Sequence, residues 1–244
     1  DETSSATNDS TPSTRIFNIW GNHEFYNFKR DEILNSPLNT ARLLNQNLDS
    51  GGNYYSYEVT PKLRIICLDY FEYSILGFDE SSPVYQNALE FLRKHNKNED
   101  LNEADDTSSF GPNCTGINGS LRMKQVSWLK SELNACKEAG SYVIVCGHLP
   151  IHDKAADVRF LAWNAKEMLE CLWSFDKTVV AYFAGHDHQG GYFRDKKNIH
   201  HVTFRGIIET APNSNAYATV NVYDDRVSIE GVGAISNYEL FFRT

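Results

Sequence analysis

The sequence predicts an α/β protein in which helices pack against mixed sheets. Strand and helix patterns alternate through the middle of the chain, hairpin patterns close it, and no internal repeat divides the 244 residues. The chain is 41% hydrophobic, and its length allows one sizeable core. We therefore expect one domain over residues 15–244. A tail at 1–14, too poor in apolar residues to fold, is expected to be disordered.

The first expected elements are strands. An apolar run at 16–20 predicts a short buried strand that ends at Gly21. Residues 54–60 and 63–69 are rich in β-branched and aromatic residues, and Pro61 lies in the turn between them. This pattern predicts a pair of strands.

Two helices and a long loop are expected next. Residues 84–95 have a helical pattern, whereas 96–120 are polar and rich in Gly and Asn, as in loops that carry function. Residues 121–139 give the clearest helix, because Val126, Leu129, Leu133 and Cys136 recur at steps of three and four. Gly140 is expected to end it.

Strands dominate the expected C-terminal part. Apolar runs at 142–146 and 178–184 predict buried strands, and between them 164–175 predicts a helix that begins with a capping box of Asn164 and Glu167. A further strand is expected at 201–208. Residues 216–232 are expected to form a hairpin that turns at Asp224 and Asp225.

Charge and cysteine content exclude several classes of protein. The net charge of −9 makes nucleic acid an unfavourable partner, and no apolar run approaches the ~20 residues of a membrane-spanning helix. The five cysteines form no CxxC pair, so neither a disulfide framework nor a thiolate zinc site is expected. We expect a monomer in the reducing cytoplasm. A small anionic substrate would need local positive charge, which bound metal could supply.

Three short motifs follow predicted strands. They are Gly21-Asn22-His23-Glu24, Gly147-His148-Leu149-Pro150 and Gly185-His186-Asp187-His188. Ligands of α/β sheets gather at the carboxyl ends of strands, so these turns are expected to converge. Imidazole suits Mn, Fe and Zn, and amide oxygen suits harder ions such as Mn. His186 and His188 could reach two ions held ~3.5–4 Å apart around one hydroxide.

The remaining histidines lack this context. A single histidine after a strand is more often a cap than a ligand, and only the coincidence of three motifs favours a metal centre. We interpret His95 as a helix-end residue, and His200 and His201 as surface residues at the start of a strand. His152 is close enough to His148 in sequence to line the same pocket.

The three motifs resemble the later signature blocks of the calcineurin-like metallophosphoesterases. Longer stretches resemble more narrowly the manganese-dependent ADP-ribose/CDP-alcohol diphosphatases, from about Ile16 to the C-terminus. They lie at residues 21–28, 76–83, 161–164, 184–192 and 207–212. The resemblance implies a layered α/β/β/α sandwich with mixed sheets and two divalent metal ions, with Mn expected.

The resemblance also implies roles for particular residues. Asn22, His148 and His186 would bind one metal and His188 the other, while His23 would stabilise developing negative charge or protonate the leaving group. The implied substrates are small nucleoside-diphosphate derivatives, namely ADP-ribose and CDP-alcohols such as CDP-choline. Metal-bound hydroxide would attack phosphorus and release a nucleoside monophosphate.

Two further residues are expected to contact substrate. Asn27 extends the turn that carries Asn22 and His23. Phe160 lies between His148 and the 161–164 stretch, in a loop expected to face the site, although ordinary loop packing would explain it equally well.

The sequence departs from the family in one respect. Proteins of the family begin with a strand-end Asp motif and a Gly-Asp-x-x-Asp motif, whose Asp bridges both metals, and neither motif occurs here. We therefore expect a domain truncated at its N-terminus, without its first strands, in which His188 alone serves the second ion. The alternatives are another metallophosphoesterase activity, such as a cyclic-nucleotide phosphodiesterase, or a catalytically dead fragment that binds a nucleotide or a partner.

Overall fold

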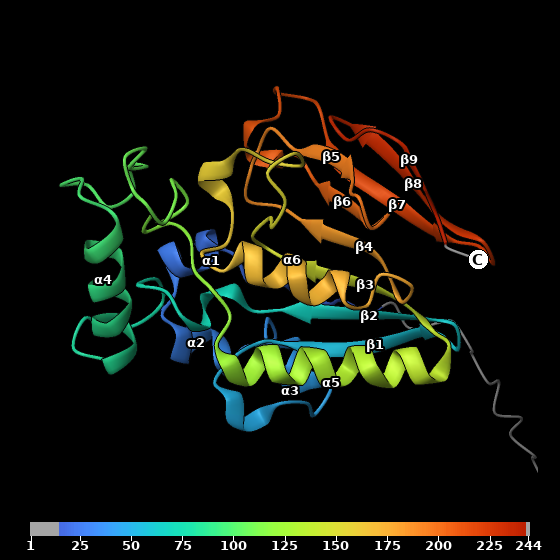
Figure 1. Ribbon diagram of the computed structural model, residues 1–244, viewed down its shortest axis with the longest axis horizontal. Coiled ribbons are helices and arrows are strands. Elements are labelled where there is room, and N and C mark those ends of the chain that lie inside the picture. The colour runs from blue at the N-terminus through green and yellow to red at the C-terminus, as the bar shows by residue number, and fades with distance from the viewer. Residues whose placement is uncertain (1–14, 243–244) are drawn as a thin grey trace, which may run out of the picture.

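The computed structural model describes residues 15–242, so the predicted tail at 1–14 lies outside the described residues. Its larger sheet has six strands in the order β1-β2-β3-β4-β6-β5 (Figure 1). The strands are β1 (Tyr55–Thr60), β2 (Leu63–Leu68), β3 (Tyr142–Gly147), β4 (Val179–Ala184), β5 (Gly191–Arg194) and β6 (His200–Thr203). The four central strands are parallel, and β1 and β5 run antiparallel at the two edges.

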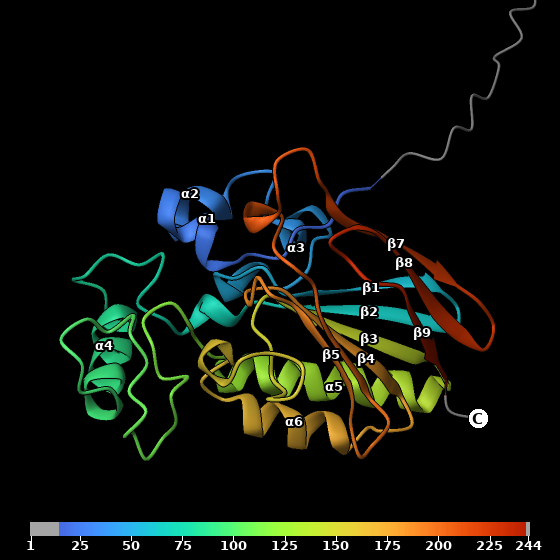
Figure 2. The ribbon, with the colours of Figure 1, turned by 90° about the horizontal axis from the view of Figure 1, so that it is seen from above.

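A second sheet is antiparallel and lies against one face of the first. It consists of β7 (Ala216–Val222), β8 (Arg226–Gly233) and β9 (Tyr238–Phe241). Figure 2 shows this small sheet on one side of the large sheet and two helices on the other, namely α5 (Met123–Ala139) and α6 (Ala165–Trp173). The layered α/β class with mixed sheets is therefore confirmed.

The remaining helices are mostly short. They are α1 (Asn22–Asn27), α2 (Arg30–Leu34), α3 (Thr40–Leu43) and α4 (Pro83–His95). Single turns of 3-10 helix occur at Leu48–Ser50, Tyr70–Glu72, Val158–Phe160 and Ile207–Glu209. None of the helices in residues 15–242 is long and apolar enough to cross a membrane.

Each face of the large sheet has its own core. On the helical face, α5 and α6 bury apolar side chains such as Leu129 and Met168 against β3 and β4. On the other face, Val180 and Val202 pack against Ile229 and Leu240 of the small sheet. Because both faces are covered by apolar contacts, the central strands read as nearly continuous apolar runs.

The parallel strands bring two of the predicted motifs to one edge. Leu68 at the end of β2 lies opposite Gly147 at the end of β3, and Cys146 lies opposite Phe183 near the end of β4. His148 and His186 therefore leave the sheet at the same edge. This is the position at which open α/β sheets bind ligands.

Several predicted elements are confirmed with small shifts of their ends. The strands at 54–60, 63–69, 142–146 and 178–184, the hairpin, and the helices near 84–95 and 121–139 are all present. Gly140 ends α5 in the left-handed region, with φ +67°. His95 is the last residue of α4, as predicted.

The predicted strand at 16–20 is wrong. Ile16 and Phe17 are exposed, and only Trp20 is deeply buried. The backbone of Asn18 forms its hydrogen bonds with side chains and not with a neighbouring strand. The Asn18 amide donates to Thr40 Oγ1, and its carbonyl accepts from Asn53 Nδ2 and Tyr55 Oη.

Three predictions about the C-terminal half also need correction. The strand expected at 201–208 ends at Thr203. Asn164 makes no side-chain cap at the start of α6, so the predicted capping box is absent there. His200 and His201 are not surface residues, since each is 2% exposed, because the His200 ring stacks on Tyr192 and the His201 ring packs against His152 and Tyr182.

Candidate metal centre

Asn22 reaches the sheet edge because a helix begins there. The backbone amide of Gly21 donates to Glu24 Oε2 at 2.6 Å, which closes the first turn of α1. A side chain at position 21 would not fit, since its Cβ would lie 2.5 Å from His148 Cε1. The Asn22 amide donates through Nδ2 to Tyr26 Oη at 2.9 Å, so its Oδ1 is turned towards the histidines.

Three donor atoms converge at this point. His148 Nε2 lies 2.8 Å from Asn22 Oδ1 and 3.2 Å from His186 Nδ1, and the third side of the triangle, from His186 Nδ1 to Asn22 Oδ1, is 3.1 Å. Ligands about 2.1 Å from an octahedral ion are about 3.0 Å apart at neighbouring positions. One amide oxygen and two imidazole nitrogens therefore have the spacing and the chemistry for three cis positions on an ion such as Mn²⁺.

Both imidazoles in the triangle are neutral. Desolvation, with smaller contributions from neighbouring histidines, lowers the pKa of His148 to about 3 and that of His186 to about 2. His186 Nε2 faces Asn118 Oδ1 at 2.8 Å, so the ring donates through Nε2 and keeps a lone pair on Nδ1. A hydrogen bond of this kind behind a ligating histidine fixes its tautomer and its orientation.

The backbone of His186 is unusual. Its φ is 67°, in the left-handed region that non-glycine residues rarely adopt. Such strained residues concentrate at functional sites, where the surrounding structure holds them in place. In this backbone conformation, the His186 ring places Nδ1 within 3.2 Å of His148 Nε2.

His188 and His23 lie beside the triangle. Their ring centroids are 5.6 Å apart, and His188 Nδ1 lies 3.0 Å from Glu209 Oε1. His188 is therefore held by a carboxylate on the side away from its Nε2 atom. His23 also packs against the Tyr26 ring, with centroids 5.3 Å apart.

The two residues predicted to contact substrate differ in their surroundings. Asn27 is exposed, and its Nδ2 donates to the His23 carbonyl at 2.8 Å. Phe160 points its ring edge-on at His186, with centroids 5.4 Å apart. It also lines a cavity of about 330 Å³ together with Asn102, Asp106, Thr115 and Arg159.

His152, which was expected to line the same pocket as His148, has its described ring contacts elsewhere. Its ring packs against Phe193 and His201, with centroids 4.8 Å away in both cases. The structure instead adds residues that the motifs did not reveal, namely Tyr26, Asn118 and Glu209. For Asn118, the Gly/Asn-rich loop was the available signal, but nothing local identified which residue of that loop would reach His186.

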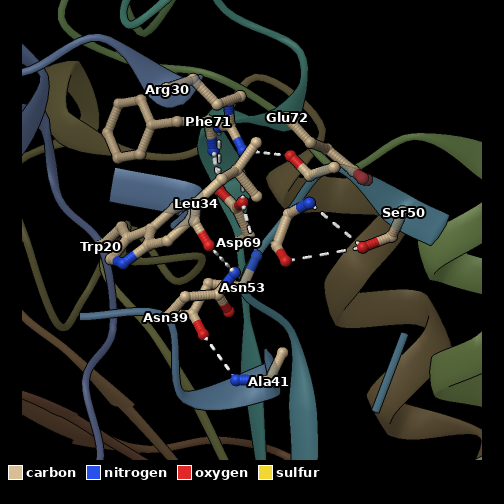
Figure 3. Close-up of polar contacts among 12 residues, drawn as sticks. Trp20, Arg30, Leu34, Asn39, Ala41, Ser50, Asn53, Asp69, Phe71 and Glu72 are labelled. Carbon is tan, nitrogen blue, oxygen red and sulfur yellow. Dashed lines mark hydrogen bonds and ion pairs between the residues drawn. The ribbon is translucent and has the colours of Figure 1, made fainter. Parts of the chain in front are cut away.

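A buried ion pair fixes the segment that carries Asn22. Arg30 of α2 donates to Asp69 at the end of β2, with Nη1–Oδ2 at 2.8 Å and Nη2–Oδ1 at 3.3 Å. Asp69 also accepts from the backbone amide of Asn53, and Figure 3 shows it between Arg30 and Asn53. The Arg30 guanidinium also lies over the Trp20 and Phe25 rings. Arg30 therefore connects the segment that contains Asn22 to the end of β2.

The comparisons with known proteins agree with this geometry. The model of the calcineurin-like phosphoesterase family matches residues 5–190. Two histidines that follow strands and Asn22 of α1 together present the donor atoms that a metal centre needs, and the family match shows that the chain belongs to the calcineurin-like phosphoesterase family.

Its relatives are more specific. The chain is 41% identical over 93% of its length to the manganese-dependent ADP-ribose/CDP-alcohol diphosphatase of Bos taurus, of which it covers 69%. It is 40% identical over 90% of its length to the Homo sapiens protein of the same name, of which it covers 66%. The crystal structure of a dimetal phosphatase from Danio rerio matches with a TM-score of 0.87 and 34% identity, covering 93% of this chain and 72% of that one. The chain thus spans about two thirds of the length of these relatives, and it is a metal-dependent hydrolase acting on phosphorus.

Proposed function

We propose that this protein hydrolyses the diphosphate bond of ADP-ribose and of CDP-alcohols such as CDP-choline, using two divalent metal ions, with Mn²⁺ expected. The observation that carries the proposal is the triangle of Asn22 Oδ1, His148 Nε2 and His186 Nδ1. The substrate class comes from the names of relatives up to 41% identical to it.

In this proposal the residues of the candidate metal centre have different roles. Asn22, His148 and His186 would hold one ion, and His188 would hold the other. When bound, the ions would supply a hydroxide nucleophile and neutralise the phosphate oxygens. His23, which lies next to His188 and outside the triangle, stabilises the charge that develops on the leaving group or donates a proton to it.

The substrate would extend away from the triangle along Phe160. The cavity beside that ring is lined by the amide of Asn102 and the carboxylate of Asp106, groups that can hydrogen-bond a base or a sugar. Asn27, exposed at the end of α1, would contact the other end of the substrate.

The setting proposed for this activity is a monomer in the cytoplasm. All five cysteines are buried and free, as is usual for proteins of reducing compartments. The net charge of −9 disfavours nucleic acid, so the partner is the small substrate.

A substrate panel tests the proposal. ADP-ribose, CDP-choline, cyclic AMP and p-nitrophenyl phosphate are incubated with Mn²⁺ and either the 244-residue chain or a chain with the family's two Asp motifs supplied ahead of residue 15. We expect AMP from ADP-ribose and CMP from CDP-choline. Turnover of cyclic AMP or p-nitrophenyl phosphate alone would refute the diphosphatase assignment. If both chains bound nucleotide tightly and neither turned over any substrate, the alternative of a catalytically inactive nucleotide-binding protein would be favoured.

A further inference from the structure

A groove that is distinct from the Phe160 cavity begins at His188. It consists of two adjoining cavities of about 230 Å³ and 360 Å³, both of which have Gln189 and Arg205 in their walls. The smaller cavity includes His188, and the larger one includes Tyr238 of the small sheet. None of these residues lines the Phe160 cavity. The candidate metal centre therefore adjoins a second recess, which the motifs did not indicate.

The fold brings Arg205 to the same sheet edge as the metal centre. Strand β6 is parallel to β4, and the last residues of the two strands lie opposite each other. Arg205 follows that pair by two positions, as His186 does, so both leave the sheet at this edge. The Gly206 amide donates to the His188 carbonyl at 3.1 Å, and a Cβ on Gly206 would lie 2.7 Å from His188 Cδ2. The segment that carries Arg205 thus packs directly against His188.

The Arg205 guanidinium is held by an uncharged acceptor. Its Nε donates to the Gln189 backbone carbonyl at 2.7 Å. The side chain is exposed, and its two Nη atoms carry further N–H donors. A guanidinium matches the oxygens of a phosphate group, which it can bind through two parallel hydrogen bonds. Arg205 is therefore fixed beside His188 with a positive charge and a geometry that suit a phosphate.

The rest of the groove carries groups that suit a sugar. Hydroxyl side chains line both cavities, namely Thr210 and Ser214 in the smaller one and Thr203 and Ser236 in the larger one. The Glu209 carboxylate also lines the smaller cavity, but it is engaged by His188 Nδ1 at 3.0 Å and by Gln189 Nε2 at 3.4 Å. Hydroxyl and amide groups hydrogen-bond the hydroxyls of a sugar and fix its orientation.

We propose, resting on the proposed diphosphatase function, that this groove binds a sugar phosphate, namely the ribose 5-phosphate half of ADP-ribose. Arg205 binds the phosphate of that half, and the hydroxyl-lined walls bind its sugar. The nucleoside half extends along Phe160, so the diphosphate lies across the candidate metal centre. Asn27 would contact the same half as Arg205, since Asn27 is bonded to His23, the neighbour of His188.

The test titrates ribose 5-phosphate into the metal-free 244-residue chain and follows the amide NMR spectrum. We expect saturable shifts concentrated at residues 188–191, 203–206 and 234–236. Arg205→Ala should weaken binding by about tenfold or more, because it removes charge-assisted hydrogen bonds to the phosphate. Phosphocholine should bind more weakly than ribose 5-phosphate, since its trimethylammonium group has no hydroxyls to pair with the walls of the groove.

Arg194→Ala is the matched control. Arg194 is also exposed, but it lies opposite His200 at the turn end of the β5–β6 hairpin, whereas Arg205 follows the open end. This variant should bind ribose 5-phosphate as the wild type does.

The proposal is overturned if the wild type shows no saturable shifts, if the shifts lie outside the groove, or if Arg205→Ala and Arg194→Ala weaken binding equally. Phosphocholine binding as tight as that of ribose 5-phosphate would overturn the assignment of a sugar phosphate. If the spectrum of Arg205→Ala shows that it is not folded, Arg205→Gln decides the matter. The titration needs no turnover, so its outcome is separate from that of the substrate panel, which tests the proposed function.

Discussion

At the scale of single residues, neighbouring positions of α1 have different tasks. Asn22 is buried with its oxygen in the donor triangle, whereas His23, the next residue, lies outside the triangle beside His188 and Tyr26. The two side chains are about 100° apart around the helix axis, which is why one can face the donor triangle while the other lies outside it.

The His23 assignment predicts a specific separation of effects. In a catalytically competent chain, His23→Ala should keep its metal and lose roughly 10²–10⁴-fold in turnover, the usual contribution of acid catalysis or charge stabilisation. Metal analysis alongside steady-state kinetics measures both. His95→Ala, at the far end of α4, is the control and should change neither. Loss of metal from His23→Ala would make His23 a ligand and would refute this role.

Glu72 is a second residue with an unusual environment. Burial, and then the charge of Asp69, raises the pKa of Glu72 from 4.5 to about 7, against hydrogen bonds from Arg122 and Gln125. The folded state thus holds a proton that the unfolded state releases between these two values. Stability from this group is fully present below about pH 4.5 and is lost as the pH rises through 7.

Glu72→Gln should therefore stabilise the protein only at higher pH. Glutamine keeps an acceptor for the Arg122 amide but has no charge to bury. We expect its free energy of unfolding to match that of the wild type near pH 4.5 and to exceed it by up to about 3 kcal/mol at pH 8. Urea denaturation at both pH values measures the difference. A gain of the same size at both would show that charge burial is not its cause.

At the scale of elements, short helices depend on single buried contacts. The five-residue helix α2 is too short to be stable alone. It is fixed by the ion pair from Arg30 to Asp69, in which neither side chain is more than 6% exposed. That pair connects the segment carrying Asn22 to the end of β2.

Breaking this pair should cost far more than breaking a surface pair. Asp69→Asn leaves Arg30 buried without its counter-charge, and we expect the free energy of unfolding to fall by about 3–5 kcal/mol. Asp79→Asn, which removes the partner of Lys29 in an exposed pair, should change the free energy of unfolding far less, because solvent screens that pair. Chemical denaturation of both variants compares them. Equal losses would mean that the buried pair does not anchor α2.

At the scale of the whole molecule, the two metal positions of the expected centre differ in how many ligands the described residues offer them. Within residues 15–242, the hydrogen bonds of Asn22, His148 and His186 involve amide, imidazole and phenol groups and no carboxylate. The family's bridging Asp motif does not occur in the 244 residues. In the proposed centre, one ion would therefore have three neutral ligands from the described residues, and the other would have His188 with Glu209 behind it.

This inequality predicts how the 244-residue chain binds Mn²⁺. Calorimetric titration should find one site of measurable affinity and a much weaker second one. Turnover of ADP-ribose should be at least about 10²-fold below that of a chain with the Asp motifs supplied, because the nucleophile is not fixed between two ions. Asn22→Ala should abolish the stronger site. Two tight sites in the 244-residue chain would show that other groups complete the centre.

Local patterns determined much of this structure. The helix at 123–139 and the central strands were predictable because their apolar periodicity is a property of the chain itself. The convergence of His148 and His186 was predictable too, since parallel strands bring their carboxyl ends to one edge, whereas Asn22 reaches that edge from a segment that is not a strand. The resemblance of the motifs then gave the family, which the relatives confirm.

Other features depended on contacts between distant parts of the chain. The apolar run at 16–20 looks like a strand, but Thr40, Asn53 and Tyr55 take up the backbone of Asn18. The sequence around His200 and His201 suggests surface residues, yet contacts with Tyr192, Tyr182 and His152 bury both rings.

Only the tertiary structure could bring Asn118 to His186, 68 residues apart, or His152 to Asp195 and His201. Sequence by itself determined the strands, the long helices and the motifs of the metal centre, because those follow from the order of neighbouring residues. Tertiary structure decided which polar groups support each histidine, because that depends on which loops meet once the layers have packed.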